Sequence, residues 1–382
     1  MAGGAPARAA LRLRLARFRS WSALQLEIPA GASVALTGPN GAGKTNLLEA
    51  LSLLAPGRGL RGASPEEFAR RPERAGWAVE VLWRAPEIEA DSAELRVGAD
   101  SEGRRVARLD GREVGRSALG APARLVWLTP ALDRLFLESP GDRRRFWDRL
   151  TLAFVPEHGE RALAYERAMR ERNRLLEEAS PDSRWLGALE EEMARAGTAL
   201  SLARVETLRR LSAAAEEASE DFPAARLSLT GLPEEALAEG FAPEEAEAAF
   251  RRRLAEGRPR DAAARRALIG PHRMDLEAVY AAKETPAALC STGEQKALLV
   301  GMILAHARAL AEFDDAPPVL LLDEISAHFD AGRRAALFQA LADLGAQVWM
   351  TGAEARLFES APPETLRLTV RETLEGSVLE GA

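Results

Sequence analysis

The sequence predicts an α/β domain assembled from both ends of a 382-residue chain, with a helical lobe inserted between them. Three observations predict it. Residues 33–37 form a short apolar stretch that runs into a glycine-rich turn and then a helical pattern, the beginning of an α/β unit. From residue 293 onward, helical and strand patterns alternate again. Between these parts, residues 157–220 are dense in charge and carry apolar residues at helical spacing.

The composition limits the class of protein. The chain has 51 basic and 58 acidic side chains, a formal net charge of −7, so a uniformly basic coat is excluded, while clustered arginines leave a local basic face open. Hydrophobic residues make up 47%, enough for a sizeable core. Cys290 is the single cysteine, and no apolar run approaches the roughly 20 residues of a membrane span. We therefore expect a cytoplasmic protein with no disulfide, no zinc site and no membrane partner.

The amino-terminal part begins with extended segments. Apolar and basic residues alternate over 11–17, and a similar alternation covers 24–28, which indicates two half-buried strands. Residues 33–37 read as a buried strand, and residues 46–54 as a helix after the glycine-rich turn. Further on, β-like pieces between about residues 76 and 128, such as 77–83 and 124–128, are separated by turns of glycine and charged residues. They predict an antiparallel meander.

The middle of the chain predicts helices. A turn at Pro181 and Asp182 would join two antiparallel helices, and a further helix with a basic face covers 243–266. Two interpretations of these helices are equally compatible with the sequence: a helical subdomain packed on the core, or a short protruding coiled coil. The apolar stripe comprises Leu186, Leu189, Met193, Ala196, Leu200 and Ala203.

The carboxyl-terminal part returns to alternation, with helices at 293–313 and 331–344 and strands at 319–322 and 347–350. The predicted division is therefore an amino-terminal part of the α/β domain at 1–145, a helical arm lobe at 146–266, and a carboxyl-terminal part of the α/β domain at 267–382.

The glycine-rich turn matches the phosphate-binding pattern G-x-x-x-x-G-K-[ST] between a strand and a helix. Its glycines let backbone N–H groups turn inward around phosphate oxygens, and the helix amino terminus adds a favourable dipole. The lysine would reach the β and γ phosphates, and the threonine hydroxyl would complete the shell of Mg²⁺. The turn reads Gly38, Pro39, Asn40, Gly41, Ala42, Gly43, Lys44 and Thr45.

A second candidate motif, a pair of acidic residues, follows the apolar strand 319–322. A buried strand would deliver Asp323 to the metal beside the phosphates, and Glu324 could orient and deprotonate water. Taken alone, this could be a core strand capped by solvent-facing acids. Together with the phosphate loop, it predicts an enzyme that hydrolyses nucleoside triphosphates.

A third segment, residues 290–295, opens a helix with Ser291 and Gly293. By itself this could be an ordinary serine or threonine helix cap. Its order and distance from the acidic strand resemble the signature motif of ABC-type ATPases. That resemblance implies that Ser291 and Gly293 bind the γ-phosphate of a nucleotide held by a partner subunit.

Several segments together resemble the RecF family. They are residues 15–20 near the start, 44–50 after the phosphate loop, 128–133 followed by 143–149, and 270–273 before the signature. The match covers both ends of the chain and is weakest over about 155–265. It implies a P-loop ABC-type ATPase head with an inserted helical lobe.

The sequence departs from the family pattern at several positions. Met274 precedes Asp275 where the family has two acids, and Thr351 stands where transporters have a switch histidine. No glutamine lies near 128–133, so Thr129 or Asp133 would replace the glutamine of the Q-loop. His328 and Asp330 follow the acidic strand, and Asp330 matches the aspartate of the D-loop. Slow turnover is the expected consequence.

The resemblance implies weak DNA-stimulated ATPase activity, ATP and Mg²⁺ as ligands, and an ATP-dependent homodimer that closes on single-stranded or gapped duplex DNA in repair and replication. RecO and RecR are the implied protein partners. Arg19 would contact the nucleotide, and an exposed arginine at a strand edge is an alternative of at least equal weight. Another SMC-like ATPase, nuclease-associated or defensive, whose arm binds a protein effector, is the alternative. Three arginine clusters could contact DNA: 104, 105 and 108, then 143–145, then 251–253.

Overall fold

The computed structural model describes residues 7–71, 76–100, 102–178, 182–217, 221–324 and 329–381. The chain forms two compact units. The first is made mainly of the residues up to Asp133 and from Leu299 onward, and the second of Arg134–Ala218 and Pro223–Leu298. The first unit thus joins both ends of the chain, as the sequence predicted for the α/β domain. The domain boundaries predicted at residues 145 and 266 stay a prediction.

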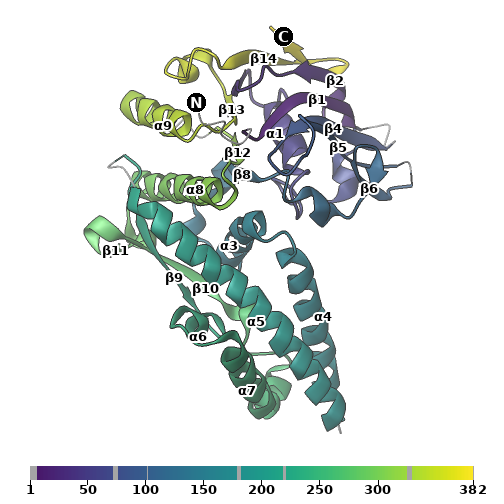
Figure 1. The fold of residues 1–382 in the computed structure, drawn as a ribbon, viewed down its shortest axis with the longest axis vertical. Coiled ribbons are helices and arrows are strands. Elements are labelled where there is room, and N and C mark those ends of the chain that lie inside the picture. The colour runs from purple at the N-terminus through teal and green to yellow at the C-terminus, as the bar shows by residue number, and fades with distance from the viewer. Residues whose placement is uncertain are drawn as a thin grey trace. The chain divides into compact units, whose positions relative to one another are not determined.

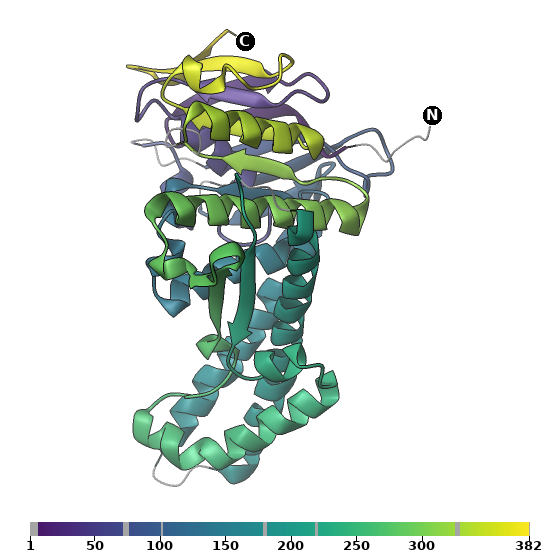
Figure 2. The ribbon, with the colours of Figure 1, turned by 90° about the vertical axis from the view of Figure 1, so that its left-hand side faces the viewer.

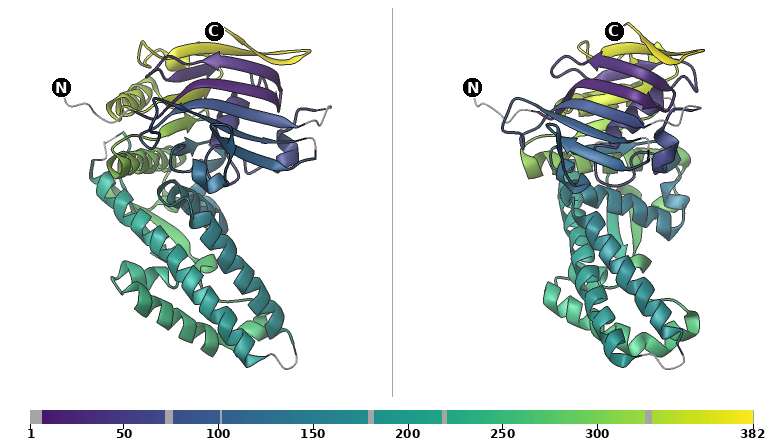
Figure 3. Two further views of the ribbon diagram at one scale, coloured as in Figure 1. Left: turned by 45° about the vertical axis from the view of Figure 1, so that its right-hand side comes forward. Right: turned by 90° about the vertical axis from the view of Figure 1, so that its right-hand side faces the viewer.

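An antiparallel sheet in the order β2-β1-β4-β5-β6-β7 forms one layer of the first unit, seen in purple and blue in Figure 3. The predicted alternation is confirmed in its first strand, where Leu13 and Leu15 are buried while Arg14 donates to Gln25 and Glu80 on neighbouring strands. The strands are β1 (Ala9–Phe18), β2 (Trp21–Glu27), β4 (Trp77–Arg84), β5 (Ala93–Ala99), β6 (Arg105–Leu109) and β7 (Arg112–Glu113).

A second sheet of the first unit has the order β15-β14-β3-β13-β12-β8, and all its neighbouring strands are parallel except the β14–β15 hairpin. In Figure 2, late strands in yellow lie beside early strands in purple. The prediction that residues 124–128 belong to the antiparallel meander is wrong, because this strand pairs in parallel with β12. Its four residues are all buried, as parallel strands require. The strands are β3 (Val34–Thr37), β8 (Leu125–Leu128), β12 (Val319–Leu322), β13 (Val348–Gly352), β14 (Leu366–Thr373) and β15 (Gly376–Glu380).

Helices complete the first unit. They are α1 (Lys44–Ser52), α2 (Pro65–Phe68), most of α8 (Thr292–Asp314) and α9 (Ala331–Asp343). Leu47, Leu48 and Leu51 of α1 are fully buried in a core that both sheets share. This packing fixes α1, and with it the loop that precedes α1, against the parallel sheet.

The second unit is mainly helical, with α3 (Pro140–Phe154), α4 (His158–Leu176), α5 (Ser183–Ala214), α6 (Glu234–Ala238) and α7 (Pro243–Ala264). The predicted turn between α4 and α5 is confirmed in part: the Asp182 carboxylate accepts from the backbone N–H groups of Arg184 and Trp185, while Pro181 lies outside the described residues. The sequence did not predict the sheet β11-β10-β9 that accompanies these helices, made of β9 (Ala225–Thr230), β10 (Asp275–Tyr280) and β11 (Thr285–Pro286).

Buried ion pairs hold the second unit together. Arg172 donates to Glu190 at 3.0 Å and to Asp261 at 2.7 Å, which ties α4 to α5 and α7. Arg204 of α5 contacts Glu234 at 2.6 Å and also donates to the carbonyl oxygen of Pro271. Breaking one partner of such a buried pair is costly, by about 3–5 kcal/mol, because it strands a buried charge.

The family-like segment 270–273 has a structural role in this unit. His272 Nδ1 lies 2.8 Å from the Tyr165 hydroxyl, and Nε2 lies 3.0 Å from the carbonyl oxygen of Ala267. Burial lowers the pKa of His272, which favours the neutral ring. A Cβ on Gly270, whose φ is +128°, would lie 2.2 Å from the Tyr165 hydroxyl, so glycine is required there.

Among the helices in the described ranges, none combines the length and the apolar character that crossing a bilayer demands.

Candidate nucleotide-binding site

The phosphate loop connects the carboxyl end of β3 to the amino end of α1, as the sequence predicted. Gly38, Gly41 and Gly43 have φ values of +138°, +84° and +106°, a region that side chains disfavour. A Cβ on Gly38 would lie 2.2 Å from the carbonyl oxygen of Val370 in β14. At Gly41 nothing approaches within 4 Å, so this part of the loop is open. Glycine is thus needed in this loop both for the positive φ angles and for the close approach of neighbouring backbone.

A chain of hydrogen bonds braces the loop from behind. The Asn46 amide donates to the Ser20 hydroxyl at 2.8 Å, and the hydroxyls of Ser20 and Ser377 lie 2.7 Å apart. Ser377 donates to the carbonyl oxygen of Ala42 at 2.6 Å. Because each hydroxyl supplies one proton, the direction of the chain is fixed: Asn46, Ser20, Ser377, Ala42. A Cβ on Gly43 would lie 2.3 Å from the Ser377 oxygen, which accounts for the third glycine.

Lys44 is buried at the start of α1 and turns back over the loop. Its ammonium group donates to the carbonyl oxygens of Gly38 at 2.6 Å and Pro39 at 2.9 Å. Burial lowers the pKa of Lys44, while the nearby charges of Glu324 and Asp323 act in the opposite direction. The carbonyl oxygens of the loop therefore hold the Lys44 ammonium group against the phosphate loop.

The Asp323 carboxylate accepts hydrogen bonds from two hydroxyl groups. Thr45 and Thr351 both donate to Asp323 Oδ1, at 2.8 and 2.7 Å. The next backbone N–H, that of Glu324, donates to the Thr351 oxygen at 2.9 Å. Thr45 and Asp323, 278 residues apart in sequence, are therefore in direct contact, and their role as ligands of one metal stays a prediction. The sequence distinguishes Thr351 only by the histidine it replaces, because its contacts depend on the pairing of β13 with β12.

Glu324 follows β12 with a φ of +51°, a left-handed conformation that is rare for a glutamate. Such conformations persist where the surroundings hold them, and they gather at functional sites. Here the bond to Thr351 holds the Glu324 backbone, and the side chain stays half-exposed. A half-exposed carboxylate beside a phosphate loop can orient water.

The donor set suits a hard divalent cation. Mg²⁺ takes oxygen ligands and is usually held by one or two carboxylates together with substrate phosphates and water. The Thr45 hydroxyl and the Asp323 carboxylate converge at 2.8 Å, as such a site requires. Elsewhere in the described ranges, histidine, cysteine, aspartate and glutamate side chains form no group of three that could hold a metal.

Arg19 is engaged within the protein. Its guanidinium group donates to both oxygens of the fully buried Glu49 carboxylate, at 2.8 and 2.7 Å, and it also lies 5.1 Å from the ring centroid of Phe68. Arg61 reaches the same carboxylate at 3.1 Å. A bidentate pair of this kind fixes the turn between β1 and β2 against α1. The nucleotide contact predicted for Arg19 stays a prediction.

Ser291 and Gly293 belong to the second unit and begin α8. The Ser291 hydroxyl and its backbone N–H both donate to Glu294, at 2.8 Å, so the serine also takes part in a helix cap. The ion pair with Lys283 and the bonds from Ser291 lower the pKa of Glu294 to about 2. No atom lies within 4 Å of a Cβ built on Gly293, so this helix start is open.

The remaining predicted positions lie around the acidic strand. Asp330 caps α9 by accepting from the backbone N–H of Arg333 at 2.9 Å. Thr129 follows β8, whose last carbonyl oxygen accepts from the backbone N–H of Asp323 at 2.9 Å, and so lies at the same sheet edge as Asp323. Asp133 ends the short turn after it. His328 lies outside the described residues.

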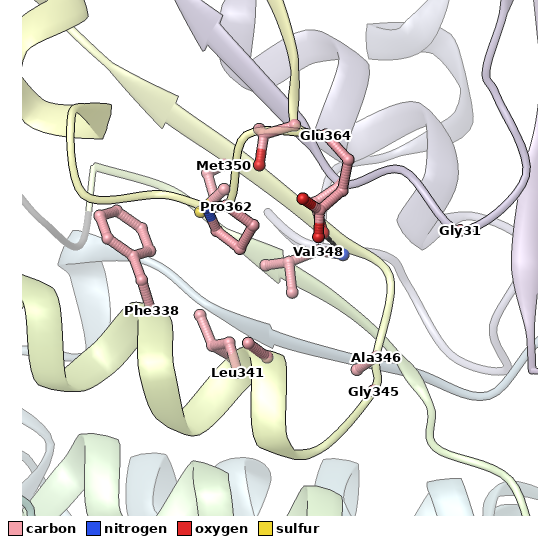
Figure 4. Close-up of a pocket in the computed structure, with 12 residues that line it drawn as sticks. Gly31, Phe338, Leu341, Gly345, Ala346, Val348, Met350, Pro362 and Glu364 are labelled. Atoms are coloured by element: carbon pink, nitrogen blue, oxygen red, sulfur yellow. Dashed lines mark hydrogen bonds between the residues drawn. The ribbon is translucent and has the colours of Figure 1, made fainter.

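A cavity of about 130 Å³ lies at the opposite end of the same strands. Figure 4 shows Phe338 and Leu341 of α9 facing Val348, which begins β13, with Pro362 and Glu364 on a neighbouring loop. Ser33, just before β3, also lines it, whereas the phosphate loop follows β3. The cavity is therefore separate from the nucleotide-binding site.

Comparison with known proteins identifies the family. Residues 10–374 match the RecF/RecN/SMC N terminal domain. The DNA replication and repair protein RecF of Mesorhizobium japonicum is 49% identical over 364 residues, which cover 94% of this chain and 95% of that protein. RecF of Caulobacter sp. strain K31 is 47% identical over 380 residues, with 95% and 97% covered.

Solved structures agree in fold. A structure of the recombination mediator protein RecF-ATPrS in the RecFOR pathway covers 97% of both chains with a TM-score of 0.82 and 22% identity. An Smc head domain from Pyrococcus furiosus, bound to the C-terminal domain of ScpA, gives a TM-score of 0.54 at 17% identity. The predicted ATPase-head fold is confirmed, and the chain belongs to the RecF family.

Proposed function

We propose that this chain is an ATP-dependent DNA-binding recombination mediator of the RecF type. One observation carries the proposal: the phosphate loop with Lys44, the contact between Thr45 and Asp323, and the adjacent Glu324 assemble in one unit. These residues supply a phosphate cradle, a cation site and a base. The two RecF relatives, similar over nearly their whole length, are named for DNA replication and repair. We extend that role to this chain.

In the proposed mechanism, the backbone N–H groups of the loop and Lys44 bind the phosphates of ATP. Thr45 and Asp323 would hold Mg²⁺, which would supply positive charge to neutralise the phosphates. Glu324 orients a water molecule and accepts its proton. Ser291 and Gly293 of a second copy complete the site, so ATP closes a homodimer on single-stranded or gapped duplex DNA. Weak hydrolysis reopens it, and RecO and RecR are the proposed partners, after the RecFOR pathway named for the structural neighbour.

A titration of DNA with and without ATP tests this function. The unaltered protein should bind DNA more tightly with ATP, and affinity should fall steeply with salt, because phosphate contacts release counterions. Lys44→Ala should lose ATP binding and the ATP-dependent gain in affinity. Glu324→Gln should bind ATP, form dimers and stay on DNA longer than the unaltered protein, because it keeps the cation site and lacks the base.

Two results would contradict the proposal. Equal DNA affinity with and without ATP at several salt concentrations would contradict ATP-dependent closure. Hydrolysis by Glu324→Gln at the rate of the unaltered protein would remove Glu324 from the mechanism.

A further inference from the structure

The three arginine clusters that could contact DNA differ in the contacts that they make within the protein. In the cluster at 143–145, Arg143 donates two hydrogen bonds to Asp275, at 2.8 and 2.6 Å, and Arg144 donates to the carbonyl oxygen of Met274. Arg145 forms an ion pair with Asp142. Arg143 and Arg144 therefore join α3 to β10. Charge reversal there would disturb the unit itself, and would not report cleanly on DNA.

The cluster on β6 is also engaged. Arg104 pairs with Glu113 at 2.9 Å, and the Arg105 guanidinium lies 6.0 Å from the ring centroid of the buried Phe68. Arg108 is only half-exposed. Arg104 is thus paired within its own sheet, and Arg105 lies against the ring of Phe68 in α2.

The third cluster differs from both. It extends beyond the predicted 251–253 into a basic stretch that covers residues 251–264 of α7 and the two residues after the helix. Within the described part of the chain, these arginines form no ion pair, and all are exposed. We call them the α7 arginines: Arg251, Arg252, Arg253, Arg260, Arg265 and Arg266.

Neighbouring helices differ in part. Several exposed arginines of α4 and α5 pair with a glutamate three residues away, as in Arg174 with Glu171, Arg195 with Glu192 and Arg209 with Glu206. That pattern is the usual solvated helix face. Along residues 251–266 the acids are the buried Asp261, which Arg172 engages, and the exposed Glu256. The basic charge of the α7 arginines is therefore largely uncompensated.

The packing of α7 directs these arginines outward. Phe250 and Leu254 are buried in a cluster with Met193 and Ala196 of α5, and Figure 1 shows α7 beside α5. Arg253 and Arg260 lie seven residues apart, hence on one face, two helical turns and about 10 Å from each other. The helical part of this stretch, residues 251–264, covers about 20 Å at helical rise, the length of roughly six base pairs of duplex.

We propose that the α7 arginines bind the phosphodiester backbone of DNA. This rests on the proposed function and names the surface that carries it. Guanidinium groups present a planar fork that matches phosphate oxygens, and such contacts carry no sequence information. In a chain with a net charge of −7, DNA must approach through a local basic surface.

The test combines three substitutions, Arg252→Ala, Arg253→Ala and Arg260→Ala, on exposed positions where alanine favours the helix. Binding of a fluorescent gapped duplex is measured with ATP over a range of salt. We expect affinity to fall at least about tenfold at moderate salt, and the slope of log affinity against log salt to lose about 2 to 3 units, roughly 0.9 for each lost phosphate contact. ATP affinity and ATP-dependent dimerisation should not change. Lysine at all three positions should restore most of the binding, because it keeps the charge.

A matched control removes the same charge elsewhere on the same unit, through Arg167→Ala, Arg170→Ala and Arg184→Ala, all exposed. It should keep the salt slope of the unaltered protein. If the α7 triple variant keeps that slope while the unaltered protein binds DNA with ATP, the inference is wrong and the proposed function stands. That result would fit a surface for an acidic protein segment. Equal losses in variant and control would also overturn it. Absence of ATP-dependent DNA binding by the unaltered protein would contradict the proposed function, and this inference with it.

Discussion

Thr351 joins the two acids of the site through hydrogen bonds. It donates to the Asp323 carboxylate at 2.7 Å and accepts from the Glu324 backbone at 2.9 Å, and it is fully buried. It therefore fixes the orientation of the proposed metal ligand and holds the left-handed backbone of the proposed base. We therefore expect Thr351 to act in the proposed hydrolysis as a positioning residue, with no contact to the phosphates required.

Replacement of Thr351 by valine keeps its shape and removes the hydroxyl group. Because the change unlinks the two acids, we expect the hydrolysis rate to fall about tenfold, equivalent to about 1.4 kcal/mol in the barrier, while ATP affinity changes less than about threefold. Thr351→Ser retains the hydroxyl and should retain most of the rate. Steady-state hydrolysis and binding of a fluorescent ATP analogue measure the two effects separately. A valine variant with the normal rate would leave Thr351 with a packing role only.

At the level of elements, the hairpin β14–β15 supports the phosphate loop. Gly38 packs on the backbone of Val370, and Ser377 bonds to the carbonyl oxygen of Ala42. The sequence motif names only loop and helix residues, so it gave no indication of this support. The hairpin lies more than 300 residues from the loop in sequence, and only the parallel pairing of β14 with β3 brings it there.

Removing the Ser377 hydroxyl should loosen the loop. Ser377→Ala removes the donor to the Ala42 carbonyl and the acceptor of the Ser20 proton, although Ser20 still accepts from Asn46. At a cost of about 1 to 1.5 kcal/mol, we expect ATP affinity to fall about five- to tenfold. Thr373→Ala, an exposed change in the turn of the same hairpin, is the control and should bind ATP normally. Titration with a fluorescent ATP analogue distinguishes them. Equal affinities for both variants would count against the bracing role.

For the whole molecule, the proposed dimer shares its sites between copies. Lys44→Ala lacks a working loop and Ser291→Arg a working signature, so each alone should be inactive. In the mixed dimer one site carries both changes and the other neither, so the mixture should regain part of the DNA-stimulated hydrolysis. Heterodimer formation with ATP is measured in parallel. If the mixture stays silent although heterodimers form, or if unaltered monomers hydrolyse ATP at high dilution, the shared site loses its support.

Local patterns predicted the parts of this molecule that depend on neighbours in sequence. The period-two alternation located β1, and the glycine spacing located the loop before α1. Patterns could not show which strand pairs with which, so residues 124–128 were assigned to the wrong sheet. They also could not show that Arg143 pairs with Asp275, 132 residues away, whereas Arg251 to Arg253 have no such partner in the described chain. Ion pairs with residues that are distant in sequence therefore determine which arginines remain free to bind DNA.

The position of β3 between β13 and β14 has a consequence during translation. Thr37 of β3 and Thr369 of β14, whose hydroxyl oxygens lie 3.3 Å apart, are 332 positions apart in the chain. At about 5 to 20 residues per second, a ribosome needs roughly 15 to 70 seconds to pass from one to the other. For most of that interval the nascent β3 has neither neighbour, since β13 is made only about 20 residues before Thr369, and unpaired strand edges invite association with other chains. The emerging polypeptide therefore exposes this edge during synthesis, and it cannot acquire its ATP cradle until β13 and β14 have been made.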